Sequence, residues 1–140
     1  MGHRLRSGFR SRRKRLQRMN KVGKILLIED DRDFSESLAI MMRMRGYELV
    51  TVCGAEEAME QIDGERFGLI IVDFRLPGMS GGEFLDWAHR HSPDTSTVLM
   101  TGCDRNAPEI ESVKESGVDE ILYKPFKIKH LLSIVENSLK

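Results

Sequence analysis

Long apolar runs are absent from the 140-residue sequence. No stretch approaches the ~18 residues that a membrane-spanning helix needs, and none resembles the apolar region of a secretion signal. Cysteine is scarce as well, because Cys53 and Cys103 are the only two, too few for a disulfide framework. The four histidines show no metal-ligand spacing with these cysteines, which argues against a zinc site. We therefore expect a cytoplasmic protein with no membrane partner.

Acidic residues are absent from positions 1–18, which hold eight of the 22 Lys and Arg residues. In residues 19–140 the other 14 basic residues are outnumbered by 22 acidic ones, a net charge of −8. A globular part with this charge is not expected to bind nucleic acid directly.

The basic residues near the start define a separate segment. Residues 1–20 combine basic side chains with few apolar ones, which predicts disorder and no contribution to the fold. This segment could be an electrostatic arm for nucleic acid or anionic lipid, an upstream extension, or a solvated tail. We favour the last two, because basic runs are weak motifs. Residues 21–140 have the length of one domain.

The central feature of that domain is the stretch 68–79. Four apolar residues, 69–72, lead directly into Asp73, and Pro77-Gly78 then turns the chain. A continuous apolar run of this kind is typical of a strand buried on both faces, as in a parallel sheet. Its terminal acid lies where open α/β sheets place their sites.

Strands and helices alternate along the remaining chain. Strands are predicted at 24–28, 47–52, 69–73, 97–100 and 119–123, and helices at 33–44, 55–62, 83–90, 107–116 and 127–139. This alternation predicts an α/β fold, a doubly wound five-stranded parallel sheet with helices on both faces. We expect the strand order 2-1-3-4-5 of flavodoxin-like folds.

Three acids meet in that order, because the first and third strands are neighbours. Glu29, Asp30 and Asp73 would share one crevice, where they repel one another unless a cation is bound. Few carboxylates with water and phosphate suit Mg²⁺, although a solvated acidic rim is the alternative. Thr101, with its hydroxyl, and Lys124, with its ammonium, directly follow the predicted strands 97–100 and 119–123. Together these groups would cradle a phosphoryl group carried by a carboxylate.

Four motifs carry a resemblance to a known family. They are Ile28–Asp31, Val72–Gly81, Met100–Gly102 and Tyr123–Phe126. In this order and spacing they resemble the receiver domain of bacterial two-component response regulators, over about residues 24–139. The resemblance implies the receiver form of the flavodoxin-like fold.

For the site, the resemblance implies that Asp73 accepts a phosphoryl group from a sensor histidine kinase or a phosphotransfer protein. Mg²⁺ would bind Asp30, Asp73 and the backbone carbonyl of Arg75, with Glu29 acting through a water. Receivers catalyse their own phosphorylation and hydrolysis, so the chain would be a signalling phosphoacceptor and not a metabolic enzyme.

The resemblance also assigns groups around the phosphoryl oxygens. Thr101 and Lys124 would contact these oxygens, and Pro125 would follow a cis peptide bond, which X-Pro bonds tolerate. Arg75 and Cys103 would occupy positions at which the family varies its hydrolysis rate.

One position departs from the family. Many receivers have Tyr or Phe three residues before the Lys, and this chain has Ile121 there. Because a β-branched side chain has few rotamers, we expect Ile121 to stay packed and the loop from Thr101 to Asn106 to carry the switch. The surface formed by 107–116, 119–123 and 127–139 would then meet an output domain, a target protein or a second copy.

Three rival functions fit the sequence less well. A metal-independent domain of this fold would lack the acids or Lys124, and a flavodoxin-like redox protein would need a phosphate loop where acids follow the first strand. An aspartyl-phosphate phosphatase would have a second acid at Arg75. A stand-alone receiver and a piece of a longer regulator both fit the sequence, which names neither kinase nor output.

Overall fold

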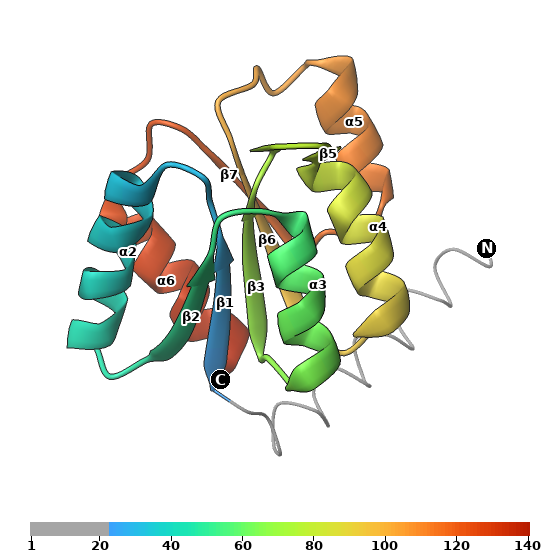
Figure 1. The fold of residues 1–140 in the computed structure, drawn as a ribbon. Coiled ribbons are helices and arrows are strands. Elements are labelled where there is room, and N and C mark those ends of the chain that lie inside the picture. Colours follow the sequence, from blue (N-terminus) through green and yellow to red (C-terminus); the bar gives the residue numbers. More distant parts are fainter. Residues whose placement is uncertain (1–22) are drawn as a thin grey trace.

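A five-stranded parallel sheet forms the centre of the protein in a computed structural model that describes residues 23–140 (Figure 1). Its strands are β1 (Lys24–Ile28), β2 (Glu48–Val52), β3 (Leu69–Asp73), β6 (Ser96–Thr101) and β7 (Glu120–Tyr123). They lie in the order β2-β1-β3-β6-β7, and all four pairings are parallel. Counted along the chain, this is the predicted order 2-1-3-4-5. The disorder predicted for residues 1–20 falls outside the described residues.

The two central strands owe their positions to their apolar composition. Residues 25–28 of β1 and 69–72 of β3 are fully buried. Strands covered on both faces have continuous apolar sequences, whereas β2 at the sheet edge combines buried, half-buried and exposed residues. Because β1 and β3 are fixed side by side, the acids at their carboxyl ends come together.

Among residues 23–140, five helices cover the sheet in two layers. They are α2 (Arg32–Met44), α3 (Ala55–Gly64), α4 (Gly81–His91), α5 (Pro108–Glu115) and α6 (Ile128–Leu139). Buried residues of α2 and α6 share one core cluster with one face of the sheet, while α3, α4 and α5 share a second cluster with the other face (Figure 1). In residues 23–140, none of the helices has the length and apolar character needed to span a membrane.

A small hairpin after β3 was not predicted. The strands β4 (Arg75–Leu76) and β5 (Met79–Ser80) pair antiparallel around a turn in which Gly78 has a φ of 76°. Strands of two residues are too short to show periodicity in a sequence. The hairpin returns the chain to the end of β3, so it positions the residues that follow Asp73.

Side-chain caps set the starts of two helices near the strand ends. The side chain of Asp31 accepts a hydrogen bond from the backbone N–H of Phe34 (3.1 Å) and begins α2. Ser80 and Glu83 form a capping box that begins α4 at Gly81, two residues earlier than predicted. Both helices therefore start directly beside the carboxyl ends of the central strands.

Candidate functional site

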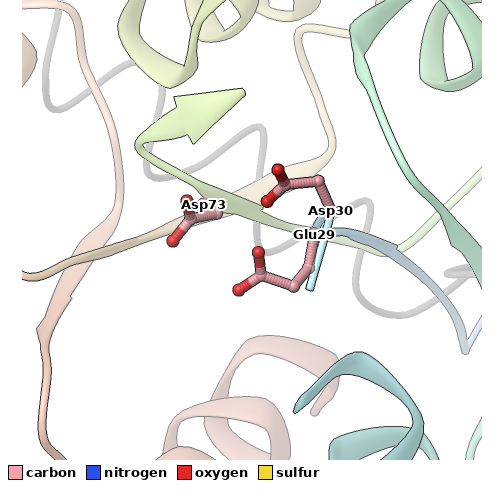
Figure 2. A group of neighbouring side chains, drawn as sticks. All are labelled: Glu29, Asp30 and Asp73. Carbon is pink, nitrogen blue, oxygen red and sulfur yellow. The ribbon is translucent and has the colours of Figure 1, made fainter. Parts of the chain in front are cut away.

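Three carboxylates gather at the carboxyl ends of the central strands. Ile28 of β1 is paired with Val72 of β3, so Glu29 and Asp30 after β1 lie beside Asp73 at the end of β3 (Figure 2). One carboxylate oxygen from each of the three acids lies within 4.8 Å of the others. Glu29 and Asp73 are buried, with 3% and 7% of their surface exposed, whereas Asp30 is open to solvent. The predicted acidic crevice is thus present.

An ammonium group neutralises part of this negative charge. The Nζ atom of Lys124 lies 2.7 Å from Oδ1 of Asp73 and 3.2 Å from Oε1 of Glu29. Burial lowers the pKa of Lys124, but the hydrogen bond and charge of Asp73, with those of Glu29, outweigh it and raise that pKa above its ordinary value. Lys124 is therefore a cation at neutral pH.

The surroundings of Glu29 disfavour its charged form, whereas those of Lys124 favour the charged form. Burial, followed by the negative charge of Asp73, raises the pKa of Glu29, and the contacts with Asp31 N–H and Lys124 offset this only in part. The carboxylate form of Glu29 is thus disfavoured in the protein without a cation. An additional positive charge would therefore stabilise the carboxylates of this site.

The chain around Asp73 is held by its own backbone. Arg75 N–H donates to Oδ2 of Asp73 (3.0 Å), while Phe74 N–H donates to the carbonyl of Met100 on β6 (2.8 Å). The side chain of Arg75 is exposed, in the β4 strand of the hairpin. One oxygen of Asp73 therefore faces a backbone donor and the other faces Lys124.

Thr101 ends β6 beside this site. Its side chain is 1% exposed, and its hydroxyl accepts a hydrogen bond from the backbone N–H of Cys103 (3.0 Å). A hydroxyl that accepts in this way still has its own O–H to donate. The carbonyl of Thr101 accepts from Lys124 N–H (2.7 Å), which ties the ends of β6 and β7 together. The Lys124–Pro125 peptide bond is cis.

An aromatic wall, which the sequence-based reasoning missed, completes the site. A pocket of about 690 Å³ is lined by the three acids and Lys124, and also by Phe34, Pro125 and Phe126. Phe34 is one of the apolar residues of the predicted helix 33–44, but its spacing does not show which residue its ring meets. The Lys-Pro-Phe sequence next to the site was the available signal for Phe126.

Ile121 lies away from the carboxylates. It pairs with Leu99 in the sheet and is partly buried against the core cluster of α3, α4 and α5. Tyr123, two residues later, has the guanidinium carbon of Arg105 4.2 Å from the centre of its ring. The aromatic residue of β7 therefore contacts the loop that follows Thr101.

The donor set fits a hard divalent cation. Carboxylate oxygens are the ligands that Mg²⁺ and Ca²⁺ prefer, and no softer ligand belongs to the acid cluster of the described residues. Two buried acids, one exposed acid and an adjacent ammonium can hold a cation and a phosphoryl group at one place.

Comparison with known proteins decides the family. The family model described as "Response regulator receiver domain" matches residues 25–136, most of the chain. The chain belongs to this family. The prediction made from the four sequence motifs is thereby confirmed, and the protein contains the receiver domain of a two-component response regulator. The receiver neighbours among solved structures confirm the predicted fold as well.

Two curated relatives show how the receiver sits within longer proteins. The chain is 35% identical over 114 residues to the response regulator protein FleR of Pseudomonas aeruginosa, covering 81% of this chain and 24% of FleR. It is 27% identical over 122 residues to the transcriptional regulatory protein FixJ of Bradyrhizobium diazoefficiens, covering 87% of this chain and 59% of FixJ. The receiver thus spans about a quarter to three fifths of these relatives.

Solved receivers share its architecture over nearly their whole length. A CheY-like receiver domain protein from Methanospirillum hungatei has a TM-score of 0.79 at 28% identity, with 85% of this chain and 94% of that chain covered. The chemotaxis response regulator CheY4 of Vibrio cholerae has a TM-score of 0.75 at 26% identity, with coverages of 85% and 100%.

Proposed function

We propose that Asp73 is the phosphoacceptor of a phosphorylation-controlled switch. The observation that carries this proposal is the ammonium of Lys124 at 2.7 Å from Asp73, between buried carboxylates in an open pocket. Asp73 would take the phosphoryl group of a phosphohistidine on a sensor histidine kinase or phosphotransfer protein. Its carboxylate oxygen forms the new P–O bond while the P–N bond breaks. The protonated histidine ring keeps the electron pair of that bond and leaves as neutral imidazole.

Mg²⁺ is the proposed cofactor. Asp30, Asp73 and the backbone carbonyl of Arg75 would hold it directly, and Glu29 would act through a water. When bound, the metal neutralises charge on the phosphoryl oxygens. This assignment is supported by the raised pKa of Glu29, which burial and then Asp73 cause, because the site is short of positive charge.

The chain's own side chains would orient the transferred group. Lys124 can stay bonded to Asp73 and turn a second N–H toward a phosphoryl oxygen, since an ammonium has three donors. Thr101 has its O–H left to donate to another oxygen. We propose that the protein thereby catalyses its own phosphorylation and dephosphorylation. Arg75, which lines the pocket, and Cys103, two residues beyond Thr101, would affect hydrolysis. The protein is a signalling phosphoacceptor and not a metabolic enzyme.

A phosphodonor that needs no kinase tests this function. Incubation with phosphoramidate and Mg²⁺, followed by intact-mass measurement, should add one phosphoryl group, and EDTA should prevent the addition. Asp73→Asn should abolish it, whereas Asp33→Asn, which changes an exposed acid in the first turn of α2, should not. Equal labelling of the wild type and Asp73→Asn would refute the assignment.

We further propose that the signal leaves through the loop 101–106. Movement of Thr101 toward the phosphoryl group would shift this loop and α5, and so alter the surface formed by α5, β7 and α6. This surface would bind an output domain, a target protein or a second copy of the chain. Relatives such as the DNA-binding response regulator MtrA suggest a DNA-binding output domain in a longer protein, with no nucleic-acid contact by the receiver itself.

Ile121 is expected to take little part in that movement, because it is packed against the core cluster already. Structures of the free protein and of the protein with beryllofluoride on Asp73 test this. The loop should move while Ile121 stays in place. A still loop with a reoriented Ile121 would contradict the proposed route. A cytoplasmic location remains our expectation for this module.

A further inference from the structure

Phe34 occupies a specific place above the ammonium of Lys124. The Nζ atom lies 4.8 Å from the centre of the Phe34 ring, within the range of a cation–π contact. The same Nζ atom bonds Asp73 and Glu29. The ammonium is thus held by two carboxylates and by the face of one aromatic ring.

The position of the ring is determined from two sides. The cap that Asp31 provides holds the backbone N–H of Phe34 and places the ring in the first turn of α2. On its other side the ring meets Phe126 edge to face, with centroids 6.1 Å apart and planes inclined at 62°. Phe126 follows Lys124 by two residues, so both ends of the contact belong to elements that border the site.

A lysine at this site needs such a contact because its side chain is flexible. Its four-carbon stem lets the ammonium reach several places, and 31% of the Lys124 side chain is exposed to water. The electronegative face of an aromatic ring attracts the ammonium when the Lys side chain places it over the ring. Phe34 therefore favours the Lys124 conformation in which the ammonium lies on Asp73.

We propose that Phe34 is a positioning residue for phosphoryl transfer, whose ring keeps the ammonium of Lys124 beside the oxygen of Asp73 that forms the P–O bond. The inference rests on the proposed function of Asp73. It assigns to the apolar wall of the pocket a part in the reaction in addition to its packing. Without the Phe34 ring, the ammonium of Lys124 spends more time in solvent. During that time the oxygens of the phosphoryl group lack this hydrogen-bond donor.

Variants at Phe34 separate the effect of the aromatic face from the effect of apolar side-chain volume. Phe34→Leu and Phe34→Met keep an apolar side chain and remove the aromatic face, whereas Phe34→Tyr keeps the face and can place its hydroxyl in the open pocket. Tyr47→Leu is the matched control, because Tyr47 is also partly buried against the same core cluster but lies beyond the other end of α2. Asp73→Asn is carried along as the test of the phosphoacceptor itself.

The first readout is the rate of labelling by phosphoramidate in saturating Mg²⁺, followed by intact mass. In this reaction the P–N bond breaks and the leaving nitrogen takes a proton from solvent as ammonia. We expect Phe34→Leu and Phe34→Met to label roughly three- to tenfold more slowly, as a cation–π contact of ordinary strength implies. Phe34→Tyr and Tyr47→Leu should label at the wild-type rate.

The second readout is the NMR signal of the Lys124 ε-methylene protons, which a ring stacked on the ammonium shifts upfield. This shift should be present in the wild type and in Phe34→Tyr, and its absence from the wild type would overturn the inference even if the Leu and Met variants did not fold. Wild-type labelling rates in both of those variants, or a Phe34→Tyr rate as low as theirs, would also overturn it. Labelling that survives in Asp73→Asn would instead refute the proposed function.

Discussion

Lys124 and Asp73 are joined by a 2.7 Å hydrogen bond although they are 51 positions apart in the sequence. Their strands are not neighbours, because β6 lies between β3 and β7 in the sheet. The long side chain of Lys124 reaches across the end of β6 to Asp73 and Glu29. In the protein without a bound metal ion, the positive charge of this ammonium balances the buried acids.

Removal of this ammonium should therefore destabilise the metal-free protein. Lys124→Gln leaves Glu29 and Asp73 without their shared cation, and we expect a loss on the order of 1–2 kcal/mol, reduced from that of a fully buried pair because Lys124 is partly exposed. Chemical denaturation in EDTA measures it. Lys129→Gln, an exposed lysine on α6, is the control and should leave stability unchanged. Equal stability of the two variants would contradict this role of Lys124.

Glu29 gives the stability a pH dependence. Burial and then Asp73 raise its folded pKa above 4.5, so its protonated form contributes stability that is present below about pH 4.5 and lost as the pH rises through the higher folded value. Glu29→Gln should be more stable than the wild type in EDTA at pH 7, and the difference should vanish toward pH 4. Melting temperatures across this range provide the check. A variant that is less stable at pH 7 would contradict the direction of the pKa shift.

Much of this arrangement could be predicted from the sequence. The apolar runs of β1 and β3 each end in acids, and buried parallel strands leave few alternatives for their order, so the meeting of Glu29, Asp30 and Asp73 followed. The S-x-x-E signature from Ser80 to Glu83 could also have given the start of α4.

Other features depend on contacts that sequence patterns do not encode. The β4–β5 hairpin is too short for a periodicity, and the contact between Phe34 and Lys124 joins residues on different elements far apart in the chain. The cis bond before Pro125 came from the family resemblance, since X-Pro sequences are mostly trans.

Metal binding should stabilise the fold through Asp30. A ligand that binds the folded chain raises its melting temperature by mass action, so the wild-type value should keep rising with the logarithm of the free Mg²⁺ concentration once that exceeds the Kd. Asp30→Ala should remove most of that increase, while Asp33→Ala on the exposed first turn of α2 should retain it. Thermal melts over a Mg²⁺ titration distinguish the two. Equal shifts in both variants would show that Asp30 is not a ligand.

The two glycines that begin α4 should differ in their tolerance of a methyl group. A Cβ at Gly81 would lie 2.6 Å from the carbonyl oxygen of Asp73 and 2.8 Å from Cα of Phe74, so backbone at the site would have to shift. A Cβ at Gly82 would be 3.3 Å from a Val113 methyl group. We expect Gly81→Ala to cost about 2 kcal/mol or more and to slow labelling, and Gly82→Ala to cost much less. Similar losses in both variants would rule out this close approach as the reason for Gly81.

Mapping of the phosphorylated residue shows directly whether Asp73 is the phosphoacceptor. Protein treated with phosphoramidate and Mg²⁺ can be reduced with borodeuteride, which converts an aspartyl phosphate into deuterated homoserine, and peptides can then be sequenced by mass spectrometry. We predict homoserine at position 73 and at no other acid of the site. Homoserine at Asp30, 5-hydroxynorvaline at Glu29, or an unmodified Asp73 in protein that carries the phosphoryl mass would contradict it.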